Sequence, residues 1–227
     1  MRESQHATVA WNEQGTPVST RFDDPYFSLD NGLEETRHTF LAGNELPARF
    51  APGFQIAELG FGTGLNMLAT LIAFRAAGSP GPVKFTSFEA FPMRADEIAR
   101  ALTAFPEAEA VAEPFLKAWA RGETRFDLGG FEVEVIIGDA REALPHWPGQ
   151  ADAWFLDGFS PAKNPELWSE ELMQAVGTHT APDGTAATYT AAGFVRRGLE
   201  AAGFTVTRQP GFGRKRHMTV AQMERLA

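Results

Sequence analysis

The sequence predicts an α/β fold in which a mainly parallel sheet is covered by helices on both faces. Three observations lead to this prediction. From about residue 51 onward, short apolar runs alternate with helical patterns. A glycine-rich turn at residues 60–64 joins the first of these runs to the helix that follows. The last two predicted strands are separated by a short polar segment, so we expect them to close the sheet as an antiparallel hairpin.

The elements follow from local signals taken in chain order. A helix is expected over residues 33–41, and a buried strand over 54–59 leads into a helix over 65–77 that Gly78 ends. A strand over 83–88 precedes helical patterns at 93–105 and 108–120. Strands at 125–128 and 131–137 flank a tight turn at Gly129 and Gly130.

The second half of the chain continues the alternation. A short apolar strand over 153–156 precedes a helix over 165–176, for which Asn164 is the expected N-cap and Pro165 the first residue. A strand over 185–190 is followed by a helix over 193–202, which Gly203 ends. Strands over 205–209 and 217–222 form the closing hairpin around residues 210–216.

The 227 residues suggest one large domain, or one with an appendage. Residues 1–50 contain several turn formers and are predicted to be an N-terminal extension, or lid, that packs on the core. Residues 51–227 carry the alternating pattern and form the main domain. There are no internal repeats, and no apolar run approaches the roughly 20 residues that a membrane helix needs.

Composition excludes several kinds of chemistry. The chain has no cysteine, which removes disulfides, zinc–thiolate sites and thiol nucleophiles. Its five histidines lack close metal-ligand spacing, so no metal is expected. The net charge of −9 argues against a protein that binds nucleic acid through a global positive field. The first residues lack the apolar core of a signal peptide, so the expectation is a cytoplasmic enzyme without a membrane partner.

The glycine turn at Gly60, Gly62 and Gly64 follows a strand and opens a helix, where backbone amides face a ligand. A dinucleotide fingerprint would require glycine at position 65 or 67, which hold Leu65 and Met67. A dehydrogenase is therefore disfavoured. The spacing resembles motif I of class I S-adenosylmethionine-dependent methyltransferases, which have a Rossmann-like fold. The alternative is a tight turn that binds no ligand.

Three further strand ends carry acidic residues, and ligands of such folds bind at this edge of the sheet. Glu89 stands 25 residues after Gly64, a distance that suits a carboxylate receiving two ribose hydroxyls. Asp139, followed by Ala140, could accept from an adenine amino group, as in methyltransferases, or simply cap the next helix. Asp157 begins a rigid proline-rich loop and would face a methyl acceptor, while Phe159 offers an aromatic face to a base or packs in the core.

Longer stretches are far more specific than the glycine turn. They are Asp-Gly-Phe-Ser-Pro-Ala-Lys-Asn-Pro at 157–165, Gly-Phe-Gly-Arg-Lys-Arg at 211–216, and shorter segments at 24–28, 31–36, 61–66, 88–92 and 192–199. Together they resemble the methyltransferase domain of the MnmC/MnmD family of tRNA-modifying enzymes. The resemblance covers most of the chain between residues 23 and 218.

The resemblance implies a reaction and a set of site residues. Members methylate the exocyclic amine of 5-aminomethyl-(2-thio)uridine at the tRNA wobble position, and in many a flavin-dependent oxidase domain follows. We therefore expect S-adenosyl-L-methionine as cofactor, its product S-adenosyl-L-homocysteine, no flavin in this chain, and tRNA and an oxidase domain as partners. Catalysis is assigned to Asp157 and Phe159. The expected cofactor-binding residues are Glu58, Gly60, Phe61, Gly62, Thr63, Gly64, Glu89, Asp139, Ala140 and Asp157.

Basic residues near the predicted site are candidates for tRNA phosphate contacts, although a solvated basic turn is the alternative. They are Lys163, Arg196, Arg197, Arg214, Lys215 and Arg216. A patch this small predicts modest, salt-sensitive affinity. The missing cysteine also favours an acceptor that is already nucleophilic, such as an amine, because methylation of a uracil ring carbon commonly uses a cysteine.

Two other functions are compatible with the same nucleotide pocket. An aminopropyltransferase or small-molecule N-methyltransferase would have an acidic, polyamine-like site and would be indifferent to tRNA. A non-catalytic nucleotide-binding module would bind the cofactor without turnover.

Overall fold

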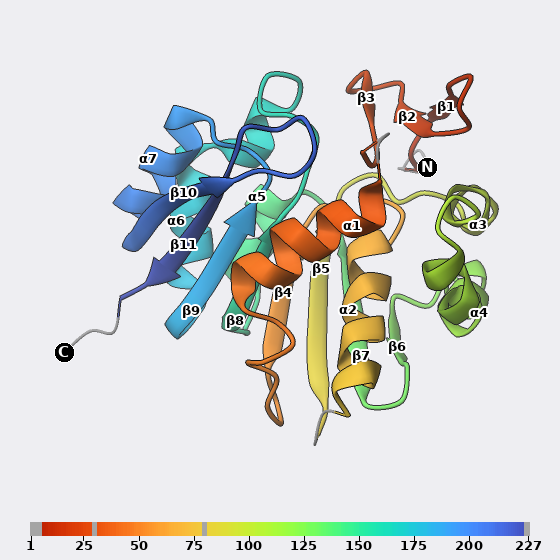
Figure 1. Cartoon of the computed structure of the whole chain (residues 1–227), viewed down its shortest axis with the longest axis horizontal. Coiled ribbons are helices and arrows are strands. Elements are labelled where there is room, and N and C mark those ends of the chain that lie inside the picture. The colour runs from red at the N-terminus through yellow and green to blue at the C-terminus, as the bar shows by residue number, and fades with distance from the viewer. Residues whose placement is uncertain (1–5, 29–30, 79–80, 225–227) are drawn as a thin grey trace.

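The computed structural model describes residues 6–28, 31–78 and 81–224 (Figure 1). An eight-stranded sheet forms the centre of the molecule, in the order β10-β11-β9-β8-β4-β5-β7-β6. Its strands are β4 (Gln55–Leu59), β5 (Val83–Glu89), β6 (Arg125–Asp127), β7 (Phe131–Ile137), β8 (Ala151–Leu156), β9 (Thr180–Thr188), β10 (Phe204–Pro210) and β11 (His217–Met223).

The five strands from β7 to β9 run parallel, and the two edges of the sheet are antiparallel. Strand β4 pairs in parallel with β5 on one side and with β8 on the other. Strand β6 pairs antiparallel with β7, and β10 and β11 form the antiparallel hairpin that the sequence predicts. The fold class is therefore confirmed. Because the strand order reverses at β4, the carboxyl ends of β4, β5 and β8 mark the place where such folds bind ligands.

Helices cover both faces of the sheet (Figure 1). They are α1 (Gly32–Thr36), α2 (Leu65–Ala77), α3 (Ala95–Leu102), α4 (Pro106–Ala120), α5 (Ala140–Ala143), α6 (Glu170–Thr178) and α7 (Gly193–Ala201). One hydrophobic cluster packs helices α1, α2, α3 and α4 against the sheet and includes Leu68, Phe85 and Phe115. A second cluster packs helices α5, α6 and α7 against the other face of the sheet, around the fully buried Trp154. Among the described residues, no helix is long and apolar enough to cross a membrane.

The N-terminal region is more ordered than its turn-rich sequence suggests. Short strands β1 (Val9–Trp11), β2 (Pro17–Ser19) and β3 (Asp24–Pro25) form a small antiparallel sheet. Strands of two or three residues show no detectable alternation of apolar and polar residues, so the sequence does not predict them. Helix α1 continues directly into a π-helical turn, Arg37–Leu41, and together they account for the helix expected over 33–41.

The largest differences from the predicted boundaries lie at the starts of α6 and β9. Residues Pro165–Trp168 form a separate 3-10 turn, and α6 begins only at Glu170, where the Ser169 hydroxyl accepts from the amide of Leu172. Asn164 makes no side-chain capping bond, so its predicted role as cap of a long helix is wrong. Strand β9 begins at Thr180 rather than at 185, although a proline, a glycine and the positive φ of Asp183 interrupt its pattern.

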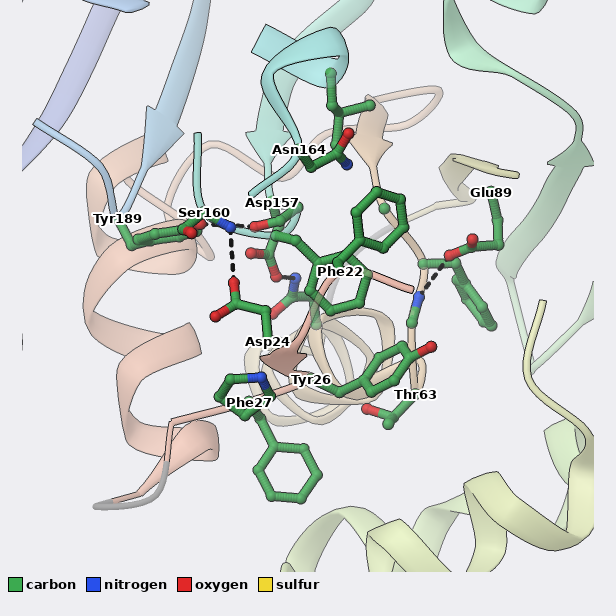
Figure 2. Close-up of a pocket in the computed structure, with 18 of the residues that line it drawn as sticks. Phe22, Asp24, Tyr26, Phe27, Thr63, Glu89, Asp157, Ser160, Asn164 and Tyr189 are labelled. Carbon is green, nitrogen blue, oxygen red and sulfur yellow. Dashed lines mark hydrogen bonds between the residues drawn. The ribbon is translucent and has the colours of Figure 1, made fainter. Parts of the chain in front are cut away.

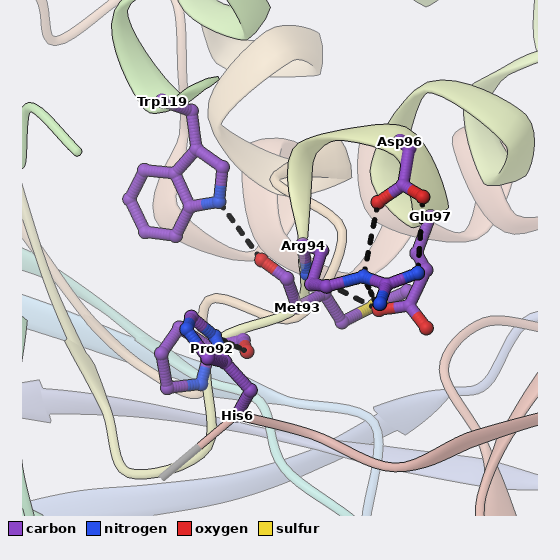
Figure 3. A network of polar contacts seen from close by, with 7 residues as sticks. All are labelled: His6, Pro92, Met93, Arg94, Asp96, Glu97 and Trp119. Atoms are coloured by element: carbon purple, nitrogen blue, oxygen red, sulfur yellow. Dashed lines mark hydrogen bonds and ion pairs between the residues drawn. The ribbon is translucent and has the colours of Figure 1, made fainter. Parts of the chain in front are cut away.

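A polar network fixes the start of α3 to the N-terminal segment and to α4 (Figure 3). The backbone amide of Arg94 donates to the Glu97 carboxylate, and the Arg94 guanidinium donates to the Asp96 carboxylate. The indole of Trp119 in α4 donates to the carbonyl of Met93 over 2.9 Å, while a ring nitrogen of His6 lies 3.1 Å from the carbonyl of Pro92. These contacts anchor the segment that follows β5, which borders the candidate site.

Candidate functional site

A cavity of about 480 Å³ opens at the carboxyl ends of β4, β5, β7 and β8 (Figure 2). Its walls come from the glycine turn after β4, the ends of β5 and β7, and the loop after β8. Residues 21–28, helix α1 and the β10–β11 hairpin complete it. The volume lies within the range of roughly 300–1,000 Å³ that is usual for small-molecule sites.

The glycine turn brings backbone, rather than side chains, to the cavity. Gly60, Gly62 and Gly64 all have positive φ, at +91°, +53° and +73°. A Cβ on Gly60 would lie 2.2 Å from the carbonyl oxygen of Asp157, so only glycine fits where the two loops meet. Gly60, Phe61, Gly62 and Thr63 line the cavity, as expected. Gly64 instead packs against Phe61 and Phe115 as the N-cap of α2.

Glu89 lies on the opposite side of the cavity from Asp157 and Tyr189 (Figure 2). Its carboxylate accepts from the amide of Gly62 over 2.9 Å and from the amide of Phe91 over 2.7 Å. Burial raises the pKa of Glu89, and these backbone donors oppose the rise. The carboxylate is thereby oriented, and the lone pairs that remain on its oxygens can accept from ligand hydroxyls.

Asp139 is the N-cap of the short helix α5. Its carboxylate accepts from the amide of Arg141 over 2.9 Å and forms an ion pair with the Arg141 guanidinium, which lowers the pKa of Asp139. The capping alternative is thus realised in the structure. Asp139, Ala140 and Arg141 also line the cavity, so contact with an adenine stays a prediction.

Asp157 and Glu58 are joined by one amide group. The Asn66 side-chain nitrogen donates to Asp157 Oδ2 over 2.8 Å and to Glu58 Oε1 over 2.9 Å. The other oxygen of Glu58 accepts from the Ser87 hydroxyl over 2.6 Å, and the Thr36 hydroxyl donates to Asn66 Oδ1 over 2.7 Å. Asp157 faces the cavity, whereas Glu58 is fully buried beneath it. Glu58 therefore supports the site from below, and its contact with the cofactor stays a prediction.

Both carboxyl groups are biased toward the protonated form. Burial raises the pKa of Asp157 from 3.8 to about 7, and Glu35 adds to the rise, while Asn66 and Lys215 oppose it. Burial raises the pKa of Glu58 to about 8. Near neutral pH, Glu58 is mainly neutral and Asp157 is close to its midpoint. A carboxyl group poised in this way can gain or lose a proton during a reaction.

Phe159 is part of an aromatic wall. Its ring stacks on Phe22 at a centroid distance of 4.8 Å and meets Tyr26 edge-on at 5.1 Å. The loop that carries it is held by the Trp168 indole, which donates to the carbonyl of Phe159 over 2.9 Å. The Tyr189 hydroxyl donates to the carbonyl of Gly158 over 2.6 Å. This wall excludes water from one side of the cavity and presents ring faces to a ligand.

The predicted phosphate-binding residues do not act alike. Lys163 is bound to the N-terminal segment, because its ammonium contacts the carbonyl of Asp23 and the carboxylates of Asp23 and Asp24. The amide of Ser160 also donates to Asp24, over 2.8 Å, so this loop and residues 23–24 form one closed wall. Lys163 thus has a structural role here, which the sequence alone does not indicate.

Lys215 points into the cavity, where its ammonium forms an ion pair with Glu35. This position differs from the expectation that Lys215 joins its neighbours on a phosphate-binding surface. Arg214 and Arg216 on the same hairpin, and Arg197 on α7, are exposed. Arg196 is partly buried, and its Nε lies 3.4 Å from the carbonyl of Ala191.

Comparisons with known proteins agree with this geometry. A family model described as "S-adenosyl-L-methionine-dependent methyltransferase" matches residues 105–224, more than half of the chain. The chain belongs to this methyltransferase family.

Individual relatives extend the match to nearly the whole chain. Two are named "tRNA 5-methylaminomethyl-2-thiouridine biosynthesis bifunctional protein MnmC". The one from Aeromonas hydrophila is 46% identical over 96% of the chain, and the one from Caulobacter vibrioides is 48% identical over 95%. The chain spans only 35% and 38% of their lengths. The crystal structure of MNMC2 from Aquifex aeolicus superposes with a TM-score of 0.78 at 26% identity, covering 100% of this chain and 73% of that one.

The cavity of this methyltransferase fits its cofactor. The glycine turn leaves room for a ligand against bare backbone, and Glu89 offers oriented carboxylate oxygens where ribose hydroxyls can donate. The residues that would hold S-adenosyl-L-methionine are therefore Gly60, Gly62 and Glu89. Within residues 6–28, 31–78 and 81–224, no cluster of three or more histidine or acidic side chains could hold a metal ion.

Several residues that line the cavity were given no individual role from the sequence. They are Phe22, Asp24, Tyr26, Glu35, Asn66 and Tyr189. Asp24, Tyr26, Glu35 and Asn66 lie in stretches that resemble the family, whereas Phe22 and Tyr189 lie outside them. The fold brings all six to the cavity from distant positions. Asn66 lies two residues after Gly64, in the first turn of α2.

Proposed function

We propose that this methyltransferase transfers the methyl group of S-adenosyl-L-methionine to the exocyclic amine of 5-aminomethyl-(2-thio)uridine at the wobble position of tRNA. The names of relatives at 46–48% identity support this substrate. The observation that carries the proposal is the Asp157 carboxylate, which faces the cavity beside the glycine turn and across from Glu89.

Asp157 suits an amine acceptor because such an acceptor arrives protonated. A primary alkylammonium has no free lone pair, so a proton must leave before the nitrogen can attack. In the proposed reaction one N–H bond breaks and its proton passes to the ionised Asp157 carboxylate. When bound, the cofactor supplies an electrophilic methyl group on a sulfonium. The nitrogen lone pair forms the new N–C bond, and the electrons of the broken C–S bond remain on the sulfur.

Nucleoside analysis of tRNA tests the proposal directly. tRNA that carries the 5-aminomethyl nucleoside is incubated with the protein and S-adenosyl-L-methionine, and we expect the methylaminomethyl nucleoside to appear. tRNA with an unmodified wobble uridine is the matched substrate control. An absence of the methylated nucleoside, with the cofactor shown to bind, would contradict the proposed function.

A second candidate is a methyltransferase, or aminopropyltransferase, for small amines. It is favoured by the acidic character of the cavity, where Glu35 and Asp157 both line the same wall. This candidate predicts turnover of free alkylamines at the same rate with and without tRNA. A dependence on tRNA would exclude it.

The proposal also includes partners. Arg196, Arg197, Arg214 and Arg216 would contact tRNA phosphates near the cavity, with Lys215 and Lys163 engaged elsewhere. Changing Arg197 and Arg216 to glutamate should weaken tRNA binding and flatten its salt dependence. The relatives are named bifunctional, so we further propose that a flavin-dependent oxidase, fused or separate, supplies the amine. Such work on tRNA would take place in the cytoplasm.

A further inference from the structure

The side chain of Lys215 enters the cavity from the hairpin between β10 and β11. The backbone of this hairpin is fixed by several contacts. The Lys215 amide donates to the carbonyl of Phe212 over 3.0 Å, and a ring nitrogen of His38 lies 2.9 Å from the carbonyl of Pro210. The long side chain is freer, with 41% of its surface exposed. Lys215 can therefore leave the cavity by rotation of its side chain alone.

The ammonium of Lys215 rests in surroundings suited to a cation. It forms an ion pair with Glu35, whose side chain is only 10% exposed. It also lies 4.4 Å from the centroid of the Tyr189 ring, in a cation–π contact. Asp157 belongs to the same group, because Lys215 lowers its pKa and Glu35 raises it. The ammonium thus contacts one carboxylate and one aromatic face, and it interacts electrostatically with a second carboxyl group.

The Tyr189 ring is held in place independently of Lys215. Its hydroxyl donates to the carbonyl of Gly158, and its ring meets Trp168 edge-on at 6.2 Å. Glu35 is fixed within α1, where its amide donates to the carbonyl of Asn31. If Lys215 turned outward, a preformed anionic and aromatic site would remain beside Asp157.

We propose that Glu35 and Tyr189 form the binding site for the ammonium group of the acceptor, and that Lys215 occupies this site as an internal substitute until the acceptor displaces it. This inference rests on the proposed function, since the acceptor there is an alkylammonium. It assigns Glu35 and Tyr189 to substrate binding and makes Lys215 a competitor, rather than a phosphate contact.

The exchange places the acceptor nitrogen next to Asp157. The acceptor ammonium replaces the Lys215 ammonium on Glu35, so the charge of the site is unchanged by binding. One N–H proton of the acceptor then passes to Asp157, and the neutral nitrogen can form its bond to the methyl carbon. Before the exchange, the Lys215 ammonium reduces the repulsion between the Glu35 and Asp157 carboxylates.

Binding measurements with two tRNAs test the inference without turnover. The tRNAs differ only in the wobble nucleoside, 5-aminomethyluridine or uridine, and the ratio of their dissociation constants reports on the amine. Lys215→Gln should increase the preference for the aminomethyl tRNA by about twofold to fivefold. This is the change in affinity that corresponds to the usual contribution of a partly exposed ion pair. Glu35→Gln should reduce that preference by a similar factor or more.

The double variant separates competition from a structural role. Once Glu35 is replaced by glutamine, Lys215→Gln should cause no further change in the preference. Arg216→Gln is the matched control on the same hairpin, and it should weaken both tRNAs equally. A Lys215→Gln protein that loses preference for the aminomethyl tRNA, or behaves as Arg216→Gln does, would overturn the inference.

A small probe keeps the inference testable if tRNA is not the substrate. Saturation-transfer NMR with ethylammonium should show stronger binding to Lys215→Gln than to the wild type, and loss of binding in Glu35→Gln. Ethanol, an uncharged analogue, should bind none of the three proteins. Failure of the wild type to bind tRNA would count against the proposed function alone, whereas equal ethylammonium binding by all three proteins would count against this inference.

Discussion

Replacing Asp157 with asparagine should remove activity and, at high pH, stabilise the fold. The substitution keeps the shape of the side chain, and its amide oxygen can still accept from Asn66, as Asp157 Oδ2 does over 2.8 Å. It removes the proton-accepting carboxylate, so we expect turnover to fall about 10²- to 10⁴-fold. Cofactor binding should persist, because the Glu89 side of the cavity is unchanged.

The stability effect follows from the pKa of Asp157, which burial raises from 3.8 to about 7. A pKa that is higher in the folded state means that the folded protein binds this proton more tightly than the unfolded chain. The corresponding stability is fully present below about pH 4 and is lost as the pH rises through about 7. The whole difference amounts to about 4 kcal/mol, of which about 2–3 kcal/mol falls between about pH 5 and pH 9.

Urea unfolding of both proteins across this pH range measures the effect. The wild type should lose about 2–3 kcal/mol of unfolding free energy relative to Asp157→Asn. Glu132→Gln, which alters an exposed carboxylate of β7, is the matched control and should follow the wild type. A constant difference between Asp157→Asn and the wild type across the range would refute the argument that Asp157 is a buried, readily protonated group. Retained turnover would refute its role as proton acceptor.

Three further changes test other parts of the site. Glu58→Gln should also gain stability relative to the wild type as the pH rises through about 8, since Glu58 is buried with a raised pKa. Turnover by Glu58→Gln should fall less than turnover by Asp157→Asn, because Glu58 does not face the cavity. Unfolding at several pH values and turnover assays measure the two effects. Gly60→Ala should abolish cofactor binding in calorimetry, because its Cβ would lie 2.2 Å from the Asp157 carbonyl oxygen. Gly53 has a φ of +82° and open space around it, so the control Gly53→Ala should lose only about 1 kcal/mol of unfolding free energy and should bind the cofactor normally. Phe159→Ala should raise the KM for the acceptor with little effect on cofactor affinity, and an unchanged KM would remove this ring from acceptor binding.

The sequence predicted well where local signals were strong. The glycine turn, helix α2 at Leu65–Ala77 and the β10–β11 hairpin all lie where expected, because glycines and hydrophobic periodicity mark them clearly. The start of α6 was misplaced because Asn164 and Pro165 look like a helix start, while Ser169 provides the actual cap. Asn164 and Pro165 begin a short 3-10 turn, and Ser169 begins the α-helix.

The site was predicted only in part, for a different reason. Residues that follow strands, such as Glu89 and Asp157, can be placed from topology because the strand ends meet at one edge of the sheet. Glu35 belongs to the stretch 31–36 that resembles the family, but topology does not place it, since it lies in a short helix outside the alternating pattern. Lys215 was recognised as basic, but its direction depends on the ion pair with Glu35, which sequence spacing does not reveal.

The contacts that close the cavity join residues far apart in the sequence, and this affects the order in which the protein folds during synthesis. The Ser160–Asp24 bond joins residues 136 positions apart, and the Lys215–Glu35 pair joins residues 180 positions apart. Contacts with such separations form late in folding, because the entropy of closing a long loop must be offset first. During synthesis the helices and inner strands can assemble while the C-terminal hairpin is still within the ribosome. The contact between Lys215 and Glu35 can therefore form only after the hairpin has emerged, later than the inner part of the sheet.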